Sequence, residues 1–225
     1  MNTLIARSLG AAVIAVSVIA GTVVAGAAPH QHSIAADSNA ARAVRATFHD
    51  TMRQLWEDHV TWTRLVIVSA ATLSDPLPDI DPTVQRLLRN QDDIGDAIKP
   101  FYGDAAGEEL SRLLREHITV AADLIFAAKA DDKAAVEAAS TAWYRNADEI
   151  ADFLAAANPK SWPASEMRAM MREHLDLTLD EAVFRLQGKY AEEIRTYDEI
   201  HAQILHMADM LSDGIVAQFP AKFAR

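Results

Sequence analysis

Three histidines occur in similar phrases at nearly even spacing, and they are the first residues whose chemistry matters. In each phrase two apolar residues, a charged residue and an acid precede the histidine, and an apolar residue follows it. The histidines lie 58 and 57 residues apart. A repeat of about this length is typical of supersecondary units that stack or bundle. The phrases are residues 55–60 with His59, residues 113–118 with His117 and residues 170–175 with His174.

The three imidazoles could bind a transition metal if the repeated units pack around a common axis. Each histidine lies on the apolar stripe of a predicted helix, which points it inward. Three inward imidazoles would form a site for zinc, copper or iron, with an open position for water or a fourth ligand. Asn90 and Asn146 follow two of the histidines and could orient the rings by hydrogen bonding.

The same pattern is also typical of a structural polar layer. Buried histidines often only hydrogen-bond a neighbouring amide or carbonyl group. No His-x-x-x-His or Glu-x-x-His pair, which would place two ligands on one helix face, occurs in the chain. Both interpretations are open at this point.

A second repeated phrase, which begins with arginine and ends with isoleucine, follows each histidine phrase. It covers residues 89–94, 145–150 and 195–200. The acid before each histidine lies about 100° around the helix from it and therefore flanks the core. We expect these acids to pair with the arginines and to clamp the helices together, although surface pairs contribute little individually. The expected pairs join Asp58, Glu116 and Glu173 to Arg89, Arg145 and Arg195.

A fourth histidine lies near the end of the chain, in a segment that departs from its sister phrases. Tyr197 and His201 are four residues apart and share a helix face, and Asp198 lies three residues before His201. His201 could add a ligand to the three histidines or act as a general base that Asp198 orients. This segment is therefore a candidate for the specialised part of the function.

The chain has 225 residues and begins with a segment typical of an export signal. Arg7 is followed by an apolar run over residues 9–24, and residues 25–27 are small, as signal peptidase requires. An uncleaved anchor is the alternative, because a spanning helix needs about 20 apolar residues. We predict a signal peptide over residues 1–27, a flexible segment over residues 28–37, and export to the periplasm, the cell envelope or the medium.

Composition narrows the class of partner. The formal net charge is −11, which repels nucleic acid phosphates and anionic lipid head groups. Neither nucleic acid nor, after removal of the signal, a membrane is an expected partner. The chain has no cysteine, which excludes disulfides and a cysteine nucleophile. It has no glycine-rich phosphate loop, so no nucleotide is expected. A metal ion or a small molecule is the expected partner.

The elements that must position these residues are helices. Apolar residues after Ser38 recur at steps of three and four, and no segment alternates as a strand does. Prolines and glycines near residues 76, 100, 159, 188 and 220 mark the breaks. We predict one all-α domain over residues 38–225, a six-helix bundle built from three pseudo-repeated antiparallel hairpins and preceded by the signal helix. The repeats are expected over about residues 38–103, 104–160 and 161–220.

Several segments resemble a group of small bacterial all-helical proteins. They are residues 59–64, 87–90, 99–103, 143–150 and 207–211, and the resemblance covers most of residues 50–220. Members often carry the labels glycosyltransferase or acetylglutamate kinase, and the resemblance would imply those activities. The residues argue against both, because the known types need a nucleotide-binding α/β sheet and this chain has no strands to build one. The resemblance supplies no catalytic residues.

Three functions are compatible with the sequence. The first is an exported binding protein for a transition metal, with His59, His117 and His174 as ligands and His201 as a fourth candidate. The second is a non-enzymatic envelope module that binds a small molecule or a protein through a groove between hairpins. The third is a metal-dependent enzyme that uses an open coordination position. The sequence favours a binding protein over an enzyme.

Overall fold

The computed structural model describes residues 30–72 and 76–224, and over these ranges the protein is all-α. This confirms the predicted fold class and the six long helices, and no strand occurs in the described ranges. The predicted signal peptide over residues 1–27 lies outside them. The helices are α1 (His30–Ala70), α2 (Ile80–Tyr102), α3 (Asp104–Lys129), α4 (Lys133–Ala157), α5 (Ala164–Leu186), α6 (Tyr190–Gln218) and the short 3-10 helix η1 (Pro220–Phe223).

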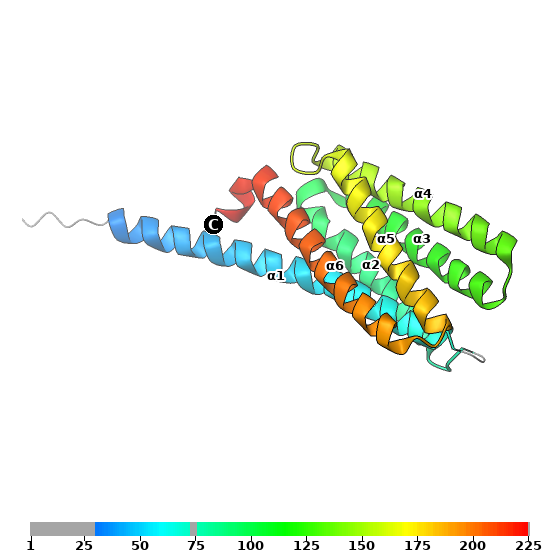
Figure 1. Cartoon of the computed structure of the whole chain (residues 1–225). Helices are drawn as coiled ribbons and strands as arrows, with labels where there is room; N and C mark the ends of the chain where they lie inside the picture. Colours follow the sequence, from blue (N-terminus) through cyan, green and yellow to red (C-terminus); the bar gives the residue numbers. More distant parts are fainter. Residues whose placement is uncertain (1–29, 73–75, 225) are drawn as a thin grey trace, which may run out of the picture.

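The six helices close a ring. Each helix packs against the next one in the chain, and α6 packs back against α1 (Figure 1). Successive helices run in opposite directions, which short connections favour. Helix α1 also touches α3 and α5 across the middle of the ring. The odd-numbered helices therefore meet inside the bundle, and residues on their inner faces can converge.

Proline, glycine and aspartate set the ends of the helices, as their positions in the sequence predict. A single residue, Gly103, joins α2 to α3 with a φ of 86°, which favours glycine. The Asp132 side chain caps α4 by accepting from the Ala135 backbone N–H at 3.0 Å. The break near Gly188 separates α5 from α6, and Pro220 follows the end of α6.

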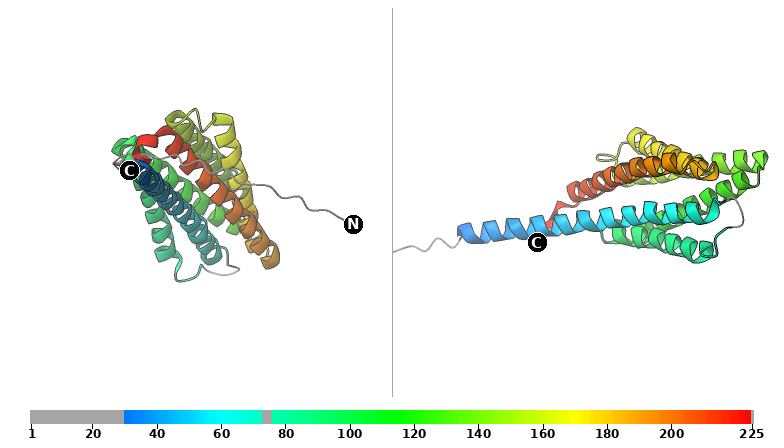
Figure 2. Two further views of the ribbon diagram at one scale, coloured as in Figure 1. Left: turned by 90° about the vertical axis from the view of Figure 1, so that its left-hand side faces the viewer. Right: turned by 60° about the horizontal axis from the view of Figure 1, so that its bottom comes forward.

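Helix α1 projects beyond the bundle at its N-terminal end (Figures 1 and 2). It begins at His30. The flexible segment over residues 28–37 stays a prediction. The alanines at positions 35, 36, 40 and 41 favour this part of the helix, since alanine has the highest helix propensity. From residue 39 on, the first buried side chain of α1 is Met52, and from there the helix packs in the bundle.

The two ends of the bundled chain lie close together. Phe223 of η1 is buried and its ring lies 5.2 Å from the ring of Phe48 on α1, centroid to centroid. Phe101, at the end of α2, packs against both rings. This aromatic cluster ties the start and the end of the bundle to the α2–α3 turn. None of the helices in the described ranges combines the length and apolar character that crossing a bilayer requires.

Candidate functional site

The three predicted histidines come together in the middle of the bundle. His59 of α1, His117 of α3 and His174 of α5 are each 3% exposed. The rings of His59 and His174 lie 5.7 Å apart, and the pKa of His59 responds to both other histidines. We call these three residues the histidine layer. Amphipathic spacing places each ring on the inner face of its helix, as the sequence predicts.

The His59 ring is held by Gln91 of α2. The Gln91 amide nitrogen donates to the Leu87 carbonyl at 2.9 Å and to Asn90 Oδ1 at 3.1 Å, which fixes the orientation of the amide. Gln91 Oε1 therefore accepts from His59 Nδ1, at 3.2 Å. The proton of the neutral ring lies on Nδ1. Asn90, the residue predicted to orient His59, contacts Gln91 and not the His59 ring itself.

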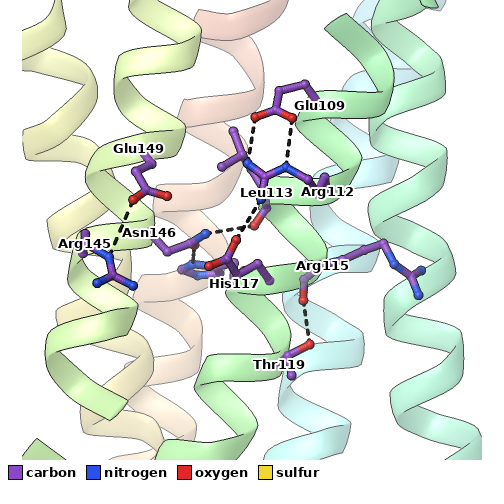
Figure 3. Close-up of polar contacts among 10 residues, drawn as sticks. Glu109, Arg112, Leu113, Arg115, His117, Thr119, Arg145, Asn146 and Glu149 are labelled. Carbon is purple, nitrogen blue, oxygen red and sulfur yellow. Dashed lines mark hydrogen bonds and ion pairs between the residues drawn. The ribbon is translucent and has the colours of Figure 1, made fainter. Parts of the chain in front are cut away.

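Both ring nitrogens of His117 already have hydrogen-bond partners. Asn146 donates to the Leu113 carbonyl at 3.1 Å, so its oxygen faces His117 Nδ1 at 2.9 Å and accepts the ring proton (Figure 3). The indole N–H of Trp143 donates to His117 Nε2 at 3.2 Å. A metal ion would have to displace one of these bonds, because the ring has no further lone pair in its plane.

His174 differs from the other two histidines. The Gln203 amide nitrogen donates to the Met170 carbonyl at 3.1 Å. Burial lowers the pKa of His174, and the Gln203 side chain offsets part of that lowering. His174 Nδ1 and Gln203 Oε1 nevertheless both lack a partner within hydrogen-bond geometry. This pair is the least satisfied part of the layer.

An equivalent hydrogen bond recurs in three pairs of consecutive helices. A side-chain amide on the even-numbered helix donates to the carbonyl four residues before the histidine of the preceding helix. The bonds run from Asn90 to Leu55, from Asn146 to Leu113 and from Gln203 to Met170. The third amide is Gln203, for which the sequence pattern gave no prediction. The third hairpin has a glutamine where the first two have an asparagine, so the equivalence is not apparent from the sequence.

Burial keeps the histidine layer neutral. Desolvation, helped by neighbouring histidines, lowers the pKa of His59 well below 6.5 and that of His117 to about 3. Desolvation also lowers the pKa of His174 to about 4. Neutral imidazole is the form that binds metals. Among the described residues, however, no group of three or more His, Cys, Asp or Glu is arranged to hold a metal ion.

His201 and its predicted partners lie apart from the histidine layer. His201 Nε2 is 2.9 Å from Glu57 Oε1 at the surface, and the His201 side chain is 36% exposed. The Tyr197 hydroxyl bonds to the Thr61 hydroxyl at 3.2 Å, and Asp198 is exposed. The partner of His201 is therefore Glu57 of α1 and not Asp198.

The predicted acid–arginine clamps do not form in the described ranges. Asp58 pairs with Arg86 and Glu116 pairs with Arg112, instead of with the predicted arginines. Arg145 and Arg195 pair within their own helices. Two further ion pairs between consecutive helices come from the arginine two residues before the histidine on α3 and on α5. They are Arg115 to Asp92, at 2.9 Å, and Arg172 to Asp148, at 2.7 Å.

The structure contains a buried ion-pair cluster that was not predicted from the sequence. Glu181 and Glu193 are each 1% exposed, and Arg64 lies between them. Arg64 Nη1 donates to Glu181 Oε1 at 2.6 Å, and Nη2 lies 2.9 Å from Glu193 Oε1 at an angle too poor for a hydrogen bond. Arg185 reaches Glu193 Oε2 at 3.4 Å. Burial, with Glu193 nearby and against the effect of Arg64, raises the pKa of Glu181 to about 7.

The sequence did contain a signal for this cluster. Glu181 stands seven residues after His174, whereas Val66 and Leu124 stand seven residues after the other two histidines. Both of those residues are buried. An acid at an otherwise apolar position of a repeat indicates a buried, paired carboxylate, since an unpaired one would be costly.

An apolar cavity of about 280 Å³ lies one helical turn from the histidine layer. Thr63, Ala121 and Thr178, each four residues after a histidine, line its near end. The C-terminal halves of α1, α3 and α5 supply most of the wall, and α4 adds Val136 and Trp143. Large apolar cavities of this kind are the default candidates for ligand sites.

A Ser–His–Asp chain at the surface lacks the access that catalysis needs. Ser212 Oγ lies 2.9 Å from His49 Nδ1, and His49 Nε2 lies 3.2 Å from Asp213 Oδ1. Ser212 is fully buried, and its hydroxyl also lies 2.6 Å from the Ala208 carbonyl. A substrate carbonyl cannot approach such a hydroxyl, so this chain is structural.

Comparison of the chain with known protein families, with curated proteins and with solved structures finds no match. The resemblance to a group of small bacterial helical proteins therefore stays a prediction. What the chain does must be inferred from its own geometry.

Proposed function

We propose that this chain is a binding protein that holds a small molecule in the cavity beside the histidine layer. The observation that carries the proposal is the cavity itself, about 280 Å³ of space among helices that are otherwise closely packed. Interiors normally contain few voids larger than a water molecule. This is the binding-module hypothesis, with the site inside the bundle and not in a groove between hairpins.

The lining favours binding over catalysis. It contains aliphatic side chains, Trp143 and two threonines, but no acid, base or strong nucleophile. Glu181 and Arg64 lie on the same helices as lining residues, yet they pair with each other. The proposal therefore assigns no reaction to the cavity.

Binding of an apolar probe tests this function. Saturating toluene or naphthalene should raise the thermal midpoint of the full chain, because a ligand that binds only the folded state stabilises it. Filling the cavity with Ala121→Leu should abolish that rise. Ala138→Leu, on the exposed face of α4, makes the same change away from the cavity and should preserve it. Equal responses of the two variants, or no response of the natural chain, would sink the proposal.

Metal binding by the histidine layer is the second candidate. The convergence of the three histidines and the unpartnered His174 Nδ1 favour it, whereas the two bonds to His117 oppose it. Elemental analysis of untagged protein, purified without added metal, tests it. Near-stoichiometric zinc, copper or iron that is lost in His59→Ala and His174→Ala would support the hypothesis. A protein that also fails to take up added metal would end it.

Three-fold repetition and export complete the proposal. The recurring amide–carbonyl bonds support an origin from three hairpins, each with one histidine. Export is supported by the pattern of residues 1–27 alone. The mass of the mature protein from its native host tests it, since cleavage near Ala27 removes a defined segment.

A further inference from the structure

We propose that the ligand of this cavity is a compact hydrocarbon-like molecule of one or two rings that carries no hydrogen-bonding head group. This inference rests on the proposed function, because it names the ligand class of the same cavity. It follows from how the few polar side chains in the wall use their hydrogen bonds. Size then narrows the class further.

The two threonines in the wall turn their hydroxyl protons away from a ligand. The Thr63 hydroxyl donates to the His59 carbonyl at 2.8 Å, one turn back along α1. The Thr178 hydroxyl donates to the His174 carbonyl, also at 2.8 Å. Each hydroxyl has a single proton to give, so neither presents a donor to the cavity.

Among the described residues of the wall, the one other polar side-chain group is the indole N–H of Trp143. It donates to His117 Nε2 at 3.2 Å, and His117 in turn donates to Asn146. The histidine layer thus accepts the one indole proton that would otherwise face the ligand. This gives the layer a role that needs no metal: it satisfies the polar groups at the near end of the cavity.

A ligand group that accepts hydrogen bonds would therefore lose its bonds to water and find no donor here. A ligand hydroxyl could donate only to the oxygen atoms of the two threonines. Burying a hydroxyl without a partner weakens binding by about tenfold or more relative to a hydrocarbon of equal size. Burying a carboxylate weakens it far more, because the charge loses its hydration. Fatty acids, alcohols and sugars are thus disfavoured.

The volume limits the ligand to a short, compact shape. An engineered cavity of about 150 Å³ in another protein holds benzene. The cavity of about 280 Å³ is nearly twice that size. One or two fused rings match this space, whereas a long acyl chain does not.

A series of naphthalene, 2-naphthol and 2-naphthoate tests the inference on the full chain. These probes share one ring skeleton and differ in the polar group. We expect naphthalene to bind at least tenfold more tightly than 2-naphthol, and 2-naphthoate to show no binding in calorimetry. Thr63→Val and Thr178→Val should leave the affinity for naphthalene within about twofold. Thr119→Val, on the exposed face of α3, is the matched control.

The outcomes separate this inference from the function beneath it. If 2-naphthol binds as tightly as naphthalene, and Thr178→Val weakens only 2-naphthol, the wall offers a hydrogen bond and the inference is overturned. The proposed binding function then still stands. If none of the three probes binds and toluene also fails, both are overturned. If a threonine variant unfolds, the ranking of the probes on the natural chain decides alone.

Discussion

At the scale of single residues, the interior holds titratable groups with opposite responses to pH. The three histidines of the layer have lowered pKa values, to about 3 for His117 and about 4 for His174. Glu181 has a pKa raised to about 7. An unfolded histidine titrates near 6.5 and an unfolded glutamate near 4.5. Between these two values the histidines and Glu181 act on stability in opposite directions.

Acid should destabilise the fold through the histidines. Below pH 6.5 the unfolded chain binds protons that the folded histidines refuse, so stability falls as the pH drops toward about 4. Glu181 opposes this, since its contribution is present below pH 4.5 and is lost as the pH rises through about 7. Glu181→Gln removes the opposing term. Its stability should therefore change with pH more steeply, by about 1.4 kcal/mol per pH unit between the two unfolded values.

Urea unfolding at steps between pH 4.5 and 6.5, the unfolded values of the two groups, measures this difference. Glu199→Gln, at an exposed position of α6, is the matched control and should follow the natural chain. Parallel profiles for Glu181→Gln and the natural chain would show that Glu181 is ionised across the whole range.

At the scale of elements, two glycines set how closely α2 and α3 approach. A Cβ atom on Gly95 would lie 2.4 Å from the Gly107 carbonyl oxygen, and one on Gly107 would lie 2.6 Å from the Gly95 carbonyl oxygen. Both contacts are with backbone atoms, which cannot move aside as a side chain can. The two backbones therefore touch where these helices cross.

Gly95→Ala should destabilise the bundle by about 1–3 kcal/mol, the usual range for overpacking. Alanine would otherwise be favoured in a helix by about 1 kcal/mol, so the sign of the effect is diagnostic. Ala138→Gly on the exposed face of α4 calibrates this propensity. Chemical denaturation measures both changes. A more stable Gly95→Ala variant would show that the helices have room to spare.

The helices were predictable from the sequence, but the buried face at the start of the last one was not. Proline and glycine end a helix for local reasons, which a single chain reveals. The inner face of α6 depends on partners elsewhere: Glu193 is buried because Arg64 and Arg185 reach it, while Ile194 is 53% exposed. Treating acids as exposed and isoleucines as buried therefore fails only in the first turns of this helix, because Ile200, Ile204 and Ile215 are buried as expected.

The candidate site was predictable in part for the same reason. The nearly equal spacing of His59, His117 and His174 in the sequence was enough to predict that their rings converge. Their hydrogen-bond partners depend on rotamers and on the helix register, so Gln91 and Gln203 were missed. A cavity leaves no mark in sequence spacing, because it depends on what the side chains fail to fill.

At the scale of the whole molecule, the closed ring of helices explains how a bundle can contain a cavity. Each helix has two neighbours in the ring and one face toward the axis. The odd-numbered helices crowd the axis at the histidine layer, and their small residues, such as Ala121 and Ala182, leave space beyond it. The bundle is therefore closely packed at the histidine layer and holds a cavity beyond it, because the side chains on the inner faces of α1, α3 and α5 differ in size along these helices.

The contact between Phe48 and Phe223 allows the helices to follow one another along the chain in a different order. Since Phe48 and Phe223 bring the two ends of the bundled segment together, the bundle should tolerate circular permutation. A permutant would begin at Asp104, continue through η1, pass through a short Gly-Ser linker and re-enter at Phe48 to finish at Gly103. It should remain helical and unfold in one cooperative step, as circular dichroism would show. A molten product would mean that folding requires the native order of the helices, in which α6 is not covalently joined to α1.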